Sequence, residues 1–144
     1  MTIANILARK GRRVITIRPE QSVRQALGLL AQHNIGALIV VSETGAAVGI
    51  VSERDIVREA VRHERVFERT VESLMTRDVV VGLPADDVAS VAHTMTERRI
   101  RHLPVLDEGR LVGIVSIGDV VKAQRDHYAG QLQTLEIQLT SGPP

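Results

Sequence analysis

Two short segments of the chain place a serine and an aspartate at the same spacing. The segments are VGIVSERD, which contains Ser52 and Asp55, and VGIVSIGD, which contains Ser116 and Asp119. An ionised aspartate only accepts hydrogen bonds, so its two oxygens suit a neutral diol such as that of a ribose, and a serine hydroxyl can reach a ribose or phosphate oxygen. If the aspartate lies in the first turn of a helix, the unpaired N–H groups and the helix dipole also favour a nearby anion. The pattern therefore indicates a site for a polyol that carries a negative group.

A structural role competes with this interpretation. Ser-x-x-Asp at a helix start is close to a capping box, in which the two side chains satisfy backbone N–H groups, and each cap stabilises a helix by about 1 kcal/mol. Capping and binding are compatible, so the motif leaves both open.

Both segments belong to an internal repeat, which is the first feature to seek when a fold is inferred from sequence. Residues 14–41 align with residues 79–106 at a constant offset of 65, and residues 48–57 align with residues 112–121 at an offset of 64. Two lead-in segments, residues 2–8 and 70–76, also resemble each other. The repeat predicts units at 1–65 and 66–127, followed by a C-terminal helical extension and tail at 128–144.

Each copy predicts a strand, a helix, two strands and a second helix. The β-branched runs at 14–17 and 79–82 predict strands that end before a proline, and Ser22 and Asp86 are the expected caps of the helices that follow. Residues 37–41, 103–106 and the two VGIVS segments predict strands that turns join in pairs. Gly49 and Gly113 lie inside these strands, where glycine indicates a close backbone approach. Because the runs are apolar on both sides, we expect an α+β fold in which tandem β-α-β-β-α repeats pack as an intramolecular pseudo-dimer.

The last helix is expected to begin near Ile117 and to continue past the repeat. Tyr128, Leu132, Leu135 and Leu139 then lie along one side of it. We interpret this stripe as a surface that packs on the module or on a symmetry mate, with docking of another protein as the alternative. The sequence SGPP ends the chain.

Two copies of this unit, each with G-I-V-S-x-x-D at the last strand-to-helix junction, resemble a pair of cystathionine β-synthase (CBS) domains of the stand-alone bacterial type, also called a Bateman module. The resemblance covers residues 2 to about 125. It implies that adenine nucleotides bind in clefts between the repeats, with the aspartate on the ribose and apolar groups of the other repeat around the base. It also implies a homodimer and a regulated partner protein.

The resemblance implies two candidate clefts. One would use Ser116, Gly118 and Asp119, with Thr16, Ile17, Pro19, Gly36, Ala37 and Leu38 around the base. The other would use Ser52, Arg54 and Asp55, with Val81, Leu83, Pro84, Arg101, His102 and Leu103. Because Arg54, Arg101 and His102 replace Gly118, Gly36 and Ala37, we expect the second cleft to bind polyphosphates more tightly.

The remaining basic residues have simpler explanations. We expect Arg58, Arg62 and Arg69 to lie on an exposed face, with Glu64 and Glu68 as their partners. The five histidines show no metal-ligand spacing, and only His102 is a candidate ligand contact. Arg12 and Arg13, in an extra loop, either screen a phosphate or have no role.

Composition excludes several classes of function. The chain has no cysteine, and it has no nucleophile-elbow or phosphate-loop motif, so we expect no enzyme activity. No secretory signal and no apolar run of about 18 residues is visible, so we expect a cytoplasmic protein with no membrane contact. A net charge of +1 and 1% aromatic residues make nucleic acid an unlikely partner.

The sequence thus predicts a regulatory module that senses an adenosine-containing nucleotide such as AMP, ATP or NAD(H), with no cofactor and no bound metal. The main alternative is an adaptor protein with empty clefts, and a nucleic-acid binder with arginine-rich faces is a lesser one.

Overall fold

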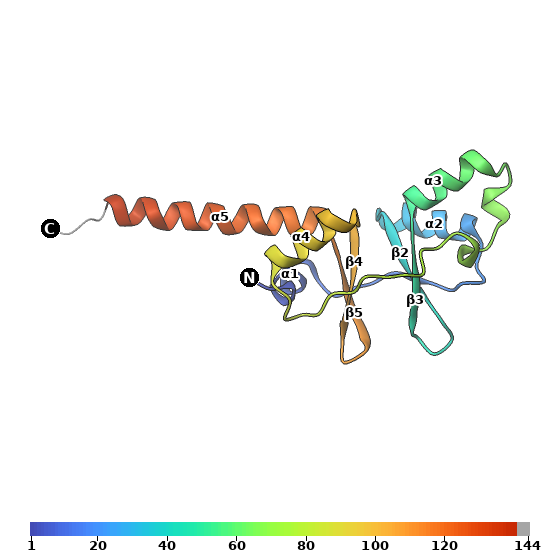
Figure 1. Ribbon diagram of the computed structural model, residues 1–144, viewed down its shortest axis with the longest axis horizontal. Helices are drawn as coiled ribbons and strands as arrows, with labels where there is room; N and C mark the ends of the chain where they lie inside the picture. Colours follow the sequence, from blue (N-terminus) through green and yellow to red (C-terminus); the bar gives the residue numbers. More distant parts are fainter. Residues whose placement is uncertain (141–144) are drawn as a thin grey trace.

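The computed structural model describes residues 1–140, so the SGPP ending lies outside the described residues. Two compact units lie side by side, and one long helix projects from the second (Figure 1). The elements follow in the order α1 (Ile3–Lys10), β1 (Thr16–Ile17), α2 (Val23–His33), β2 (Ala37–Val41), β3 (Ala47–Ser52), α3 (Glu53–Arg62), the 3₁₀ turns η1 (Val66–Glu68) and η2 (Val71–Ser73), α4 (Val88–Arg98), β4 (His102–Asp107), β5 (Arg110–Ser116) and α5 (Ile117–Thr140).

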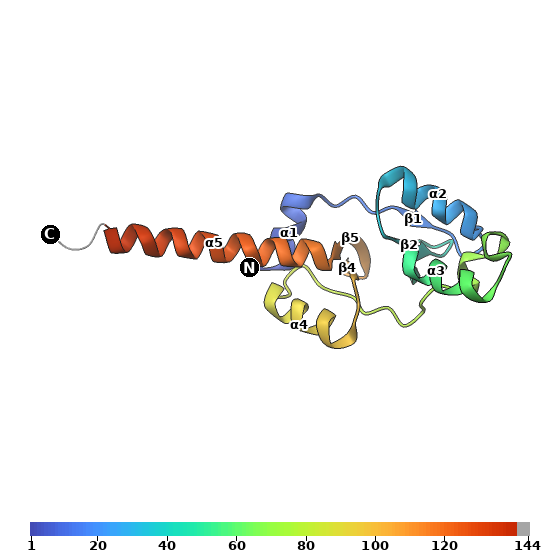
Figure 2. The ribbon, with the colours of Figure 1, turned by 90° about the horizontal axis from the view of Figure 1, so that it is seen from above.

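The expected α+β architecture is confirmed. In the first unit β1 pairs with β2 in parallel, and β2 pairs with β3 antiparallel; in the second unit β4 pairs with β5 antiparallel. Seen from above, α2 and α3 lie beside the first sheet, while α1, α4 and α5 gather around β4 and β5 (Figure 2). The two units thus form the predicted intramolecular pair.

The strand predicted at 79–82 is wrong. Only Gly82 forms an isolated parallel bridge, to Val105, where the first unit has the two-residue β1. Gly82 donates to the carbonyl of Pro104 at 2.8 Å and accepts from Leu106 at 2.9 Å. The neighbouring bridge would need an N–H from Pro104, which proline lacks, so the ladder cannot extend.

The predicted cap of α4 is also wrong by one residue. Asp87, not Asp86, precedes the helix, and its side chain accepts from the Ser90 N–H at 3.2 Å. Asp86 instead accepts from the Leu83 N–H at 2.8 Å and closes the turn before the helix. Ser22 caps α2 as expected, since its hydroxyl accepts from the Gln25 N–H.

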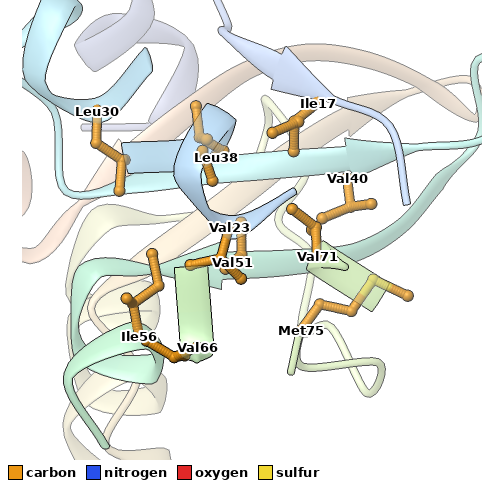
Figure 3. Close-up of a cluster of buried hydrophobic side chains, with 11 residues drawn as sticks. Ile17, Val23, Leu30, Leu38, Val40, Val51, Ile56, Val66, Val71 and Met75 are labelled. Atoms are coloured by element: carbon orange, nitrogen blue, oxygen red, sulfur yellow. The ribbon is translucent and has the colours of Figure 1, made fainter. Parts of the chain in front are cut away.

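Each unit completes its core with the lead-in segment of the other. The first core contains Val66, Val71 and Met75 of the second lead-in region, together with residues of α2 and β1–β3 (Figure 3). The second core contains residues of α1 together with α4, β4, β5 and the start of α5. The division of the chain at residue 65 stays a prediction. In space, however, each lead-in packs in the core of the other unit.

Two strand glycines make this exchange possible. A Cβ at Gly49 would lie 2.6 Å from the Met75 sulfur and 2.9 Å from the Thr76 carbonyl oxygen, and a Cβ at Gly113 would lie 2.7 Å from a Leu7 methyl. The close approach predicted for both glycines is therefore confirmed, and in each case the neighbour is the lead-in of the other unit.

The last helix begins at Ile117, as predicted, and continues to Thr140. Its second half does not pack on the chain's own units, because Tyr128, Leu132, Leu135 and Leu139 are 54–78% exposed. Figure 1 shows this half extending into solvent. Packing on the same module, one part of the sequence interpretation, is therefore wrong.

We predict that Gly49→Ala lowers the free energy of unfolding by about 1–3 kcal/mol, because the added methyl must displace a backbone carbonyl as well as the Met75 side chain. Urea-induced unfolding measures this change. The matched control is Gly28→Ala inside α2, where a Cβ meets nothing within 4 Å. That variant is expected to gain about 0.5–1 kcal/mol, since alanine is the better helix former. Equal effects of the two substitutions would contradict the close approach at Gly49.

Candidate functional site

Two cavities lie at the junction of the two units. The first, the arginine cleft, has a volume of about 220 Å³ and is lined by Gly36, Ile50, Ser52, Glu53, Arg54, Asp55, Arg58, Thr76, Arg99, Ile100, Arg101 and His102. The second, the lysine cleft, has a volume of about 300 Å³ and is lined by Lys10, Arg13, Val14, Ile15, Asn34, Ile35, Gly36, Ala37, His102, Ile114 and Ser116.

The two clefts are built from equivalent positions of the repeat. Each takes the turn after the first helix of one unit, residues 34–37 or 99–102, and the end of the last strand of the other unit. That turn begins with a left-handed residue, Asn34 (φ 51°) in the lysine cleft and Arg99 (φ 54°) in the arginine cleft. The lysine cleft also includes Lys10, two residues beyond the first lead-in. The arginine cleft includes Thr76, the last residue of the second lead-in. The repeat thus generates two similar sites with different side chains.

The arginine cleft uses its Ser-x-x-Asp motif as a helix cap. Asp55 Oδ2 accepts from the Ser52 N–H at 2.9 Å and from its hydroxyl at 3.0 Å, while the Ser52 oxygen accepts from the Asp55 N–H at 3.2 Å. The capping role considered from the sequence is therefore confirmed. Both bonds to the carboxylate use Oδ2, and Oδ1 accepts no hydrogen bond from residues 1–140. Both residues also line the cavity, which leaves the carboxylate able to accept from a ligand.

Four guanidinium groups surround this motif. Arg54 and Arg101 were expected, and the structure adds Arg58 and Arg99. None of the four forms an ion pair within the described part of the chain, whereas Arg69 pairs with Glu59 at 3.6 Å. Arg58 is exposed, as expected for a solvated face, and also lines this cavity. Four arginines without carboxylate partners can together bind an anion that carries several negative oxygens.

The lysine cleft differs because its aspartate, Asp119, forms an ion pair with Lys10. Asp119 Oδ2 accepts from the Ser116 N–H at 2.8 Å and from Lys10 Nζ at 2.5 Å. Burial by itself raises the pKa of Asp119, but the hydrogen bonds from Lys10 and Ser116 outweigh it and hold that pKa below its ordinary value. Lys10 was not among the predicted site residues. The repeat alignment held no signal for it, because the extended lead-in alignment pairs Lys10 with Asp78.

His102 and Gly36 form a wall that both clefts share. The His102 ring would lie 3.3 Å from a Cβ at Gly36, so the absence of a side chain there lets the half-buried ring fit. Burial lowers the pKa of His102, and the charges of Lys10 and Arg101 lower it further. Glu53 and Asp119 act in the opposite direction. The ring is therefore mainly neutral at pH 7.

Most of the residues expected around the base, eight in all, lie away from the two cavities. Ile17, Leu38 and Leu103 are buried in the cores, because alternate side chains of a strand point to opposite faces. The other five lie outside both cavity walls: Thr16, Pro19, Val81, Leu83 and Pro84. Gly118 lies in the first turn of α5, and a Cβ added at this glycine would lie 3.6 Å from the Ser116 hydroxyl oxygen. The structure brings together Ser52, Arg54, Asp55, Arg101 and His102 in one cleft, and Gly36, Ala37 and Ser116 in the other.

Residues 1–140 lack both a metal-binding cluster and a helix suited to cross a membrane. No three His, Asp or Glu side chains in this range lie close enough together to hold a metal ion. None of its helices combines the length and the apolar character that crossing a bilayer requires.

Comparison with known proteins places these features in a family. The sequence profile of the CBS domain matches residues 6–62 and 71–126. The CBS-domain containing protein ATU1752 from Agrobacterium tumefaciens has a TM-score of 0.83 to this structure at 40% identity, covering 85% of this chain and 92% of that one. The CBS domain-containing protein CBSX3, mitochondrial, of Arabidopsis thaliana is 33% identical over 150 residues, covering 98% of this chain and 73% of that protein.

A third relative was solved with ligands. The CBS domain pair of protein MJ0100, in complex with 5′-methylthioadenosine and S-adenosyl-L-methionine, has a TM-score of 0.78 at 30% identity and covers 88% of this chain and 98% of that one.

We predict that the stability of the folded protein falls as the pH is lowered from about 7.5 to 5.5, with His102 as one cause. The folded pKa of His102 lies below the unfolded value of about 6.5, so the unfolded state binds more protons in this window. The stabilisation is present above the unfolded pKa and is lost as the pH falls. Urea unfolding at a series of pH values gives the free energy of unfolding as a function of pH. This free energy should change less steeply with pH for His102→Gln than for the parent chain. The exposed His93, changed to Gln, is the control and should leave the slope unchanged; parallel curves for both variants would contradict the role of His102.

Proposed function

This chain belongs to the CBS domain family, and we propose that it is a regulatory module that binds adenosine-containing nucleotides, of the AMP, ATP or NAD(H) class, in the clefts between its two repeats. The observation that carries the proposal is the arginine cleft, where a cap aspartate and four arginines that form no ion pair within residues 1–140 line one cavity. In the proposal the ligand is bound without a chemical step.

The lining of the arginine cleft matches the parts of a nucleotide. Arginine presents a planar fork of donors that fits phosphate oxygens, so Arg54, Arg99 and Arg101 are assigned to the phosphates. Asp55 Oδ1 is assigned to the ribose hydroxyls. Ile50 and Ile100 supply the apolar surface of the cavity, and we assign the base to them.

The ligands of a relative support the choice of nucleoside. Both molecules in the complex of the MJ0100 domain pair contain adenosine, and that pair is similar to this chain over almost its whole length. S-adenosylmethionine carries no phosphate, whereas the arginine cleft of this chain is strongly cationic. The charge of the cleft therefore favours a phosphorylated ligand here.

The proposed output is a shift in an equilibrium with a partner protein. A ligand that binds one arrangement of the two units better than another stabilises that arrangement, and any partner that distinguishes the two will respond. The clefts lie between the units, so a ligand in either cleft contacts both of them at once.

We predict that ATP stabilises the protein and that Arg54→Ala/Arg101→Ala removes most of this effect. A ligand specific for the folded state adds about 2.7 kcal/mol at a hundredfold excess over Kd. Losing two charge-assisted hydrogen bonds should weaken ATP binding at least about 100-fold. Thermal unfolding with AMP, ADP, ATP, NAD⁺, NADH, S-adenosylmethionine and GTP, with and without Mg²⁺, provides the measurement.

The control for this prediction is Arg62→Ala/Arg110→Ala, which removes two exposed arginines outside both clefts. It should keep the full ATP response. If no adenosine compound raises the melting temperature of the parent chain, the proposed function is wrong. If the response survives in Arg54→Ala/Arg101→Ala, the assignment to the arginine cleft is wrong.

We further propose a homodimer in which α5 of one copy packs on α5 of the other. Tyr128, Leu132, Leu135 and Leu139 are exposed and follow the 4, 3, 4 spacing of a coiled-coil seam. A solitary projecting helix of this length is marginal in water. Between residues 129 and 140 the only charged side chain is Glu136, so two copies can meet without repulsion.

We expect Leu132→Glu/Leu135→Glu to reduce the mass in sedimentation from that of a dimer to that of the 15.8 kDa monomer, because four carboxylates would then meet in the seam. Gln133→Glu/Thr134→Glu adds the same charge beside the seam and should leave the dimer intact. A monomeric parent chain, or a dimer that survives the leucine changes, would refute this arrangement.

A further inference from the structure

Lys10 has an unusual position for a lysine in this chain. Lys10 and Lys122 are the only lysines among 18 basic residues, and the rest are arginines. Lys122 forms no ion pair within residues 1–140, whereas the Lys10 side chain is 33% exposed and its ammonium pairs with Asp119. It donates to Asp119 Oδ2 at 2.5 Å and to the Ile114 carbonyl at 2.8 Å. A compact ammonium can satisfy two acceptors this close together, which a planar guanidinium does less well.

These contacts change what the lysine cleft presents to a ligand. Lys10 and Ser116 line that cavity, but Asp119 does not, so its wall contains the lysine in place of the aspartate. In the arginine cleft the equivalent Asp55 lines the cavity itself, and its cap oxygen is bonded only to Ser52. Equivalent aspartates thus line the cavity in one cleft and pair with a lysine in the other.

The difference originates in the exchanged lead-ins. The first lead-in packs Leu7 against Gly113, and the second packs Met75 against Gly49, so each lead-in ends beside the Ser-x-x-Asp motif of the other unit. The lead-in alignment pairs Lys10 with Asp78, a residue of opposite charge. A lysine can therefore reach the motif in only one of the two clefts.

The lysine cleft remains suited to an anion after the ion pair forms. An ammonium has three donors, and two of them are used by Asp119 and Ile114, which leaves one for a ligand. Arg13 lines the same cavity and forms no ion pair within residues 1–140. Together with the Ser116 hydroxyl, these groups fit the oxygens of a single phosphate.

We propose that Lys10 determines the specificity of the lysine cleft, making it select a nucleoside monophosphate over the corresponding neutral nucleoside. This inference rests on the proposed function, since it concerns which nucleotide that cleft accepts. In it, Lys10 has two roles: it holds the Asp119 carboxylate in place, and it donates its remaining hydrogen to the ligand phosphate.

The test compares AMP with adenosine by isothermal titration calorimetry. The full chain with Arg54→Ala/Arg101→Ala serves as the background, so that the arginine cleft contributes little. Lys10→Met in this background should lower the preference for AMP over adenosine at least about 10-fold, because one charge-assisted hydrogen bond is lost. The affinity for adenosine should change less than about threefold. Lys122→Met is the matched control and should leave both affinities unchanged.

Other outcomes would overturn the inference. Equal weakening of AMP and adenosine would mean that Lys10 only positions Asp119, and tighter adenosine binding would mean that Lys10 blocks the carboxylate. If Lys10→Met does not fold, Lys10→Gln gives the same comparison, because it keeps a polar side chain and removes the charge. A parent chain that binds neither ligand would overturn the proposed function itself, whereas an unchanged preference in the Lys10 variants would overturn only the role of Lys10.

Discussion

The structure depends on one packing constraint, the contact between a strand glycine and the lead-in segment of the opposite unit. Leu7 occupies the space above Gly113, and Met75 occupies the space above Gly49; a methyl group at either glycine would overlap these side chains. Neither core is closed without this exchange, because the lead-in supplies some of its most buried residues. The two units are therefore held together by their own cores, and the clefts lie where these units meet.

The same constraint explains which parts of the fold and site were predictable. Local patterns predicted the repeat, the hairpins, the start of the last helix and the close approach at Gly49 and Gly113. The same patterns wrongly predicted a strand at 79–82. That strand does not form because Pro104 lacks the N–H that the ladder needs. The cleft residues close to the Ser-x-x-Asp motif were predictable from resemblance. Lys10 was not, because a residue distant in sequence reaches Asp119 only through the exchange.

The cap motif shows how one side chain can serve stability and binding together. The aspartate uses Oδ2 for the serine N–H in both copies, which fixes the carboxylate relative to the helix start. In the arginine cleft its second oxygen is then presented to the cavity in a defined position. Capping is confirmed and remains compatible with the proposed binding, because it holds the carboxylate at the helix start. Around this common frame the charges differ, with arginines on one side and a lysine ion pair on the other.

His102 connects these two divergent sites. Its ring fits between the clefts because Gly36 has no side chain, and Lys10, Glu53, Asp119 and Arg101 contribute opposing charges around it. A ring that forms part of two cavity walls cannot shift to enlarge one cavity without changing the other. An anion in either cleft would also favour its protonated form, which in turn changes the charge that the other cleft presents. If both clefts bind anions as proposed, this shared side chain would couple the two binding events.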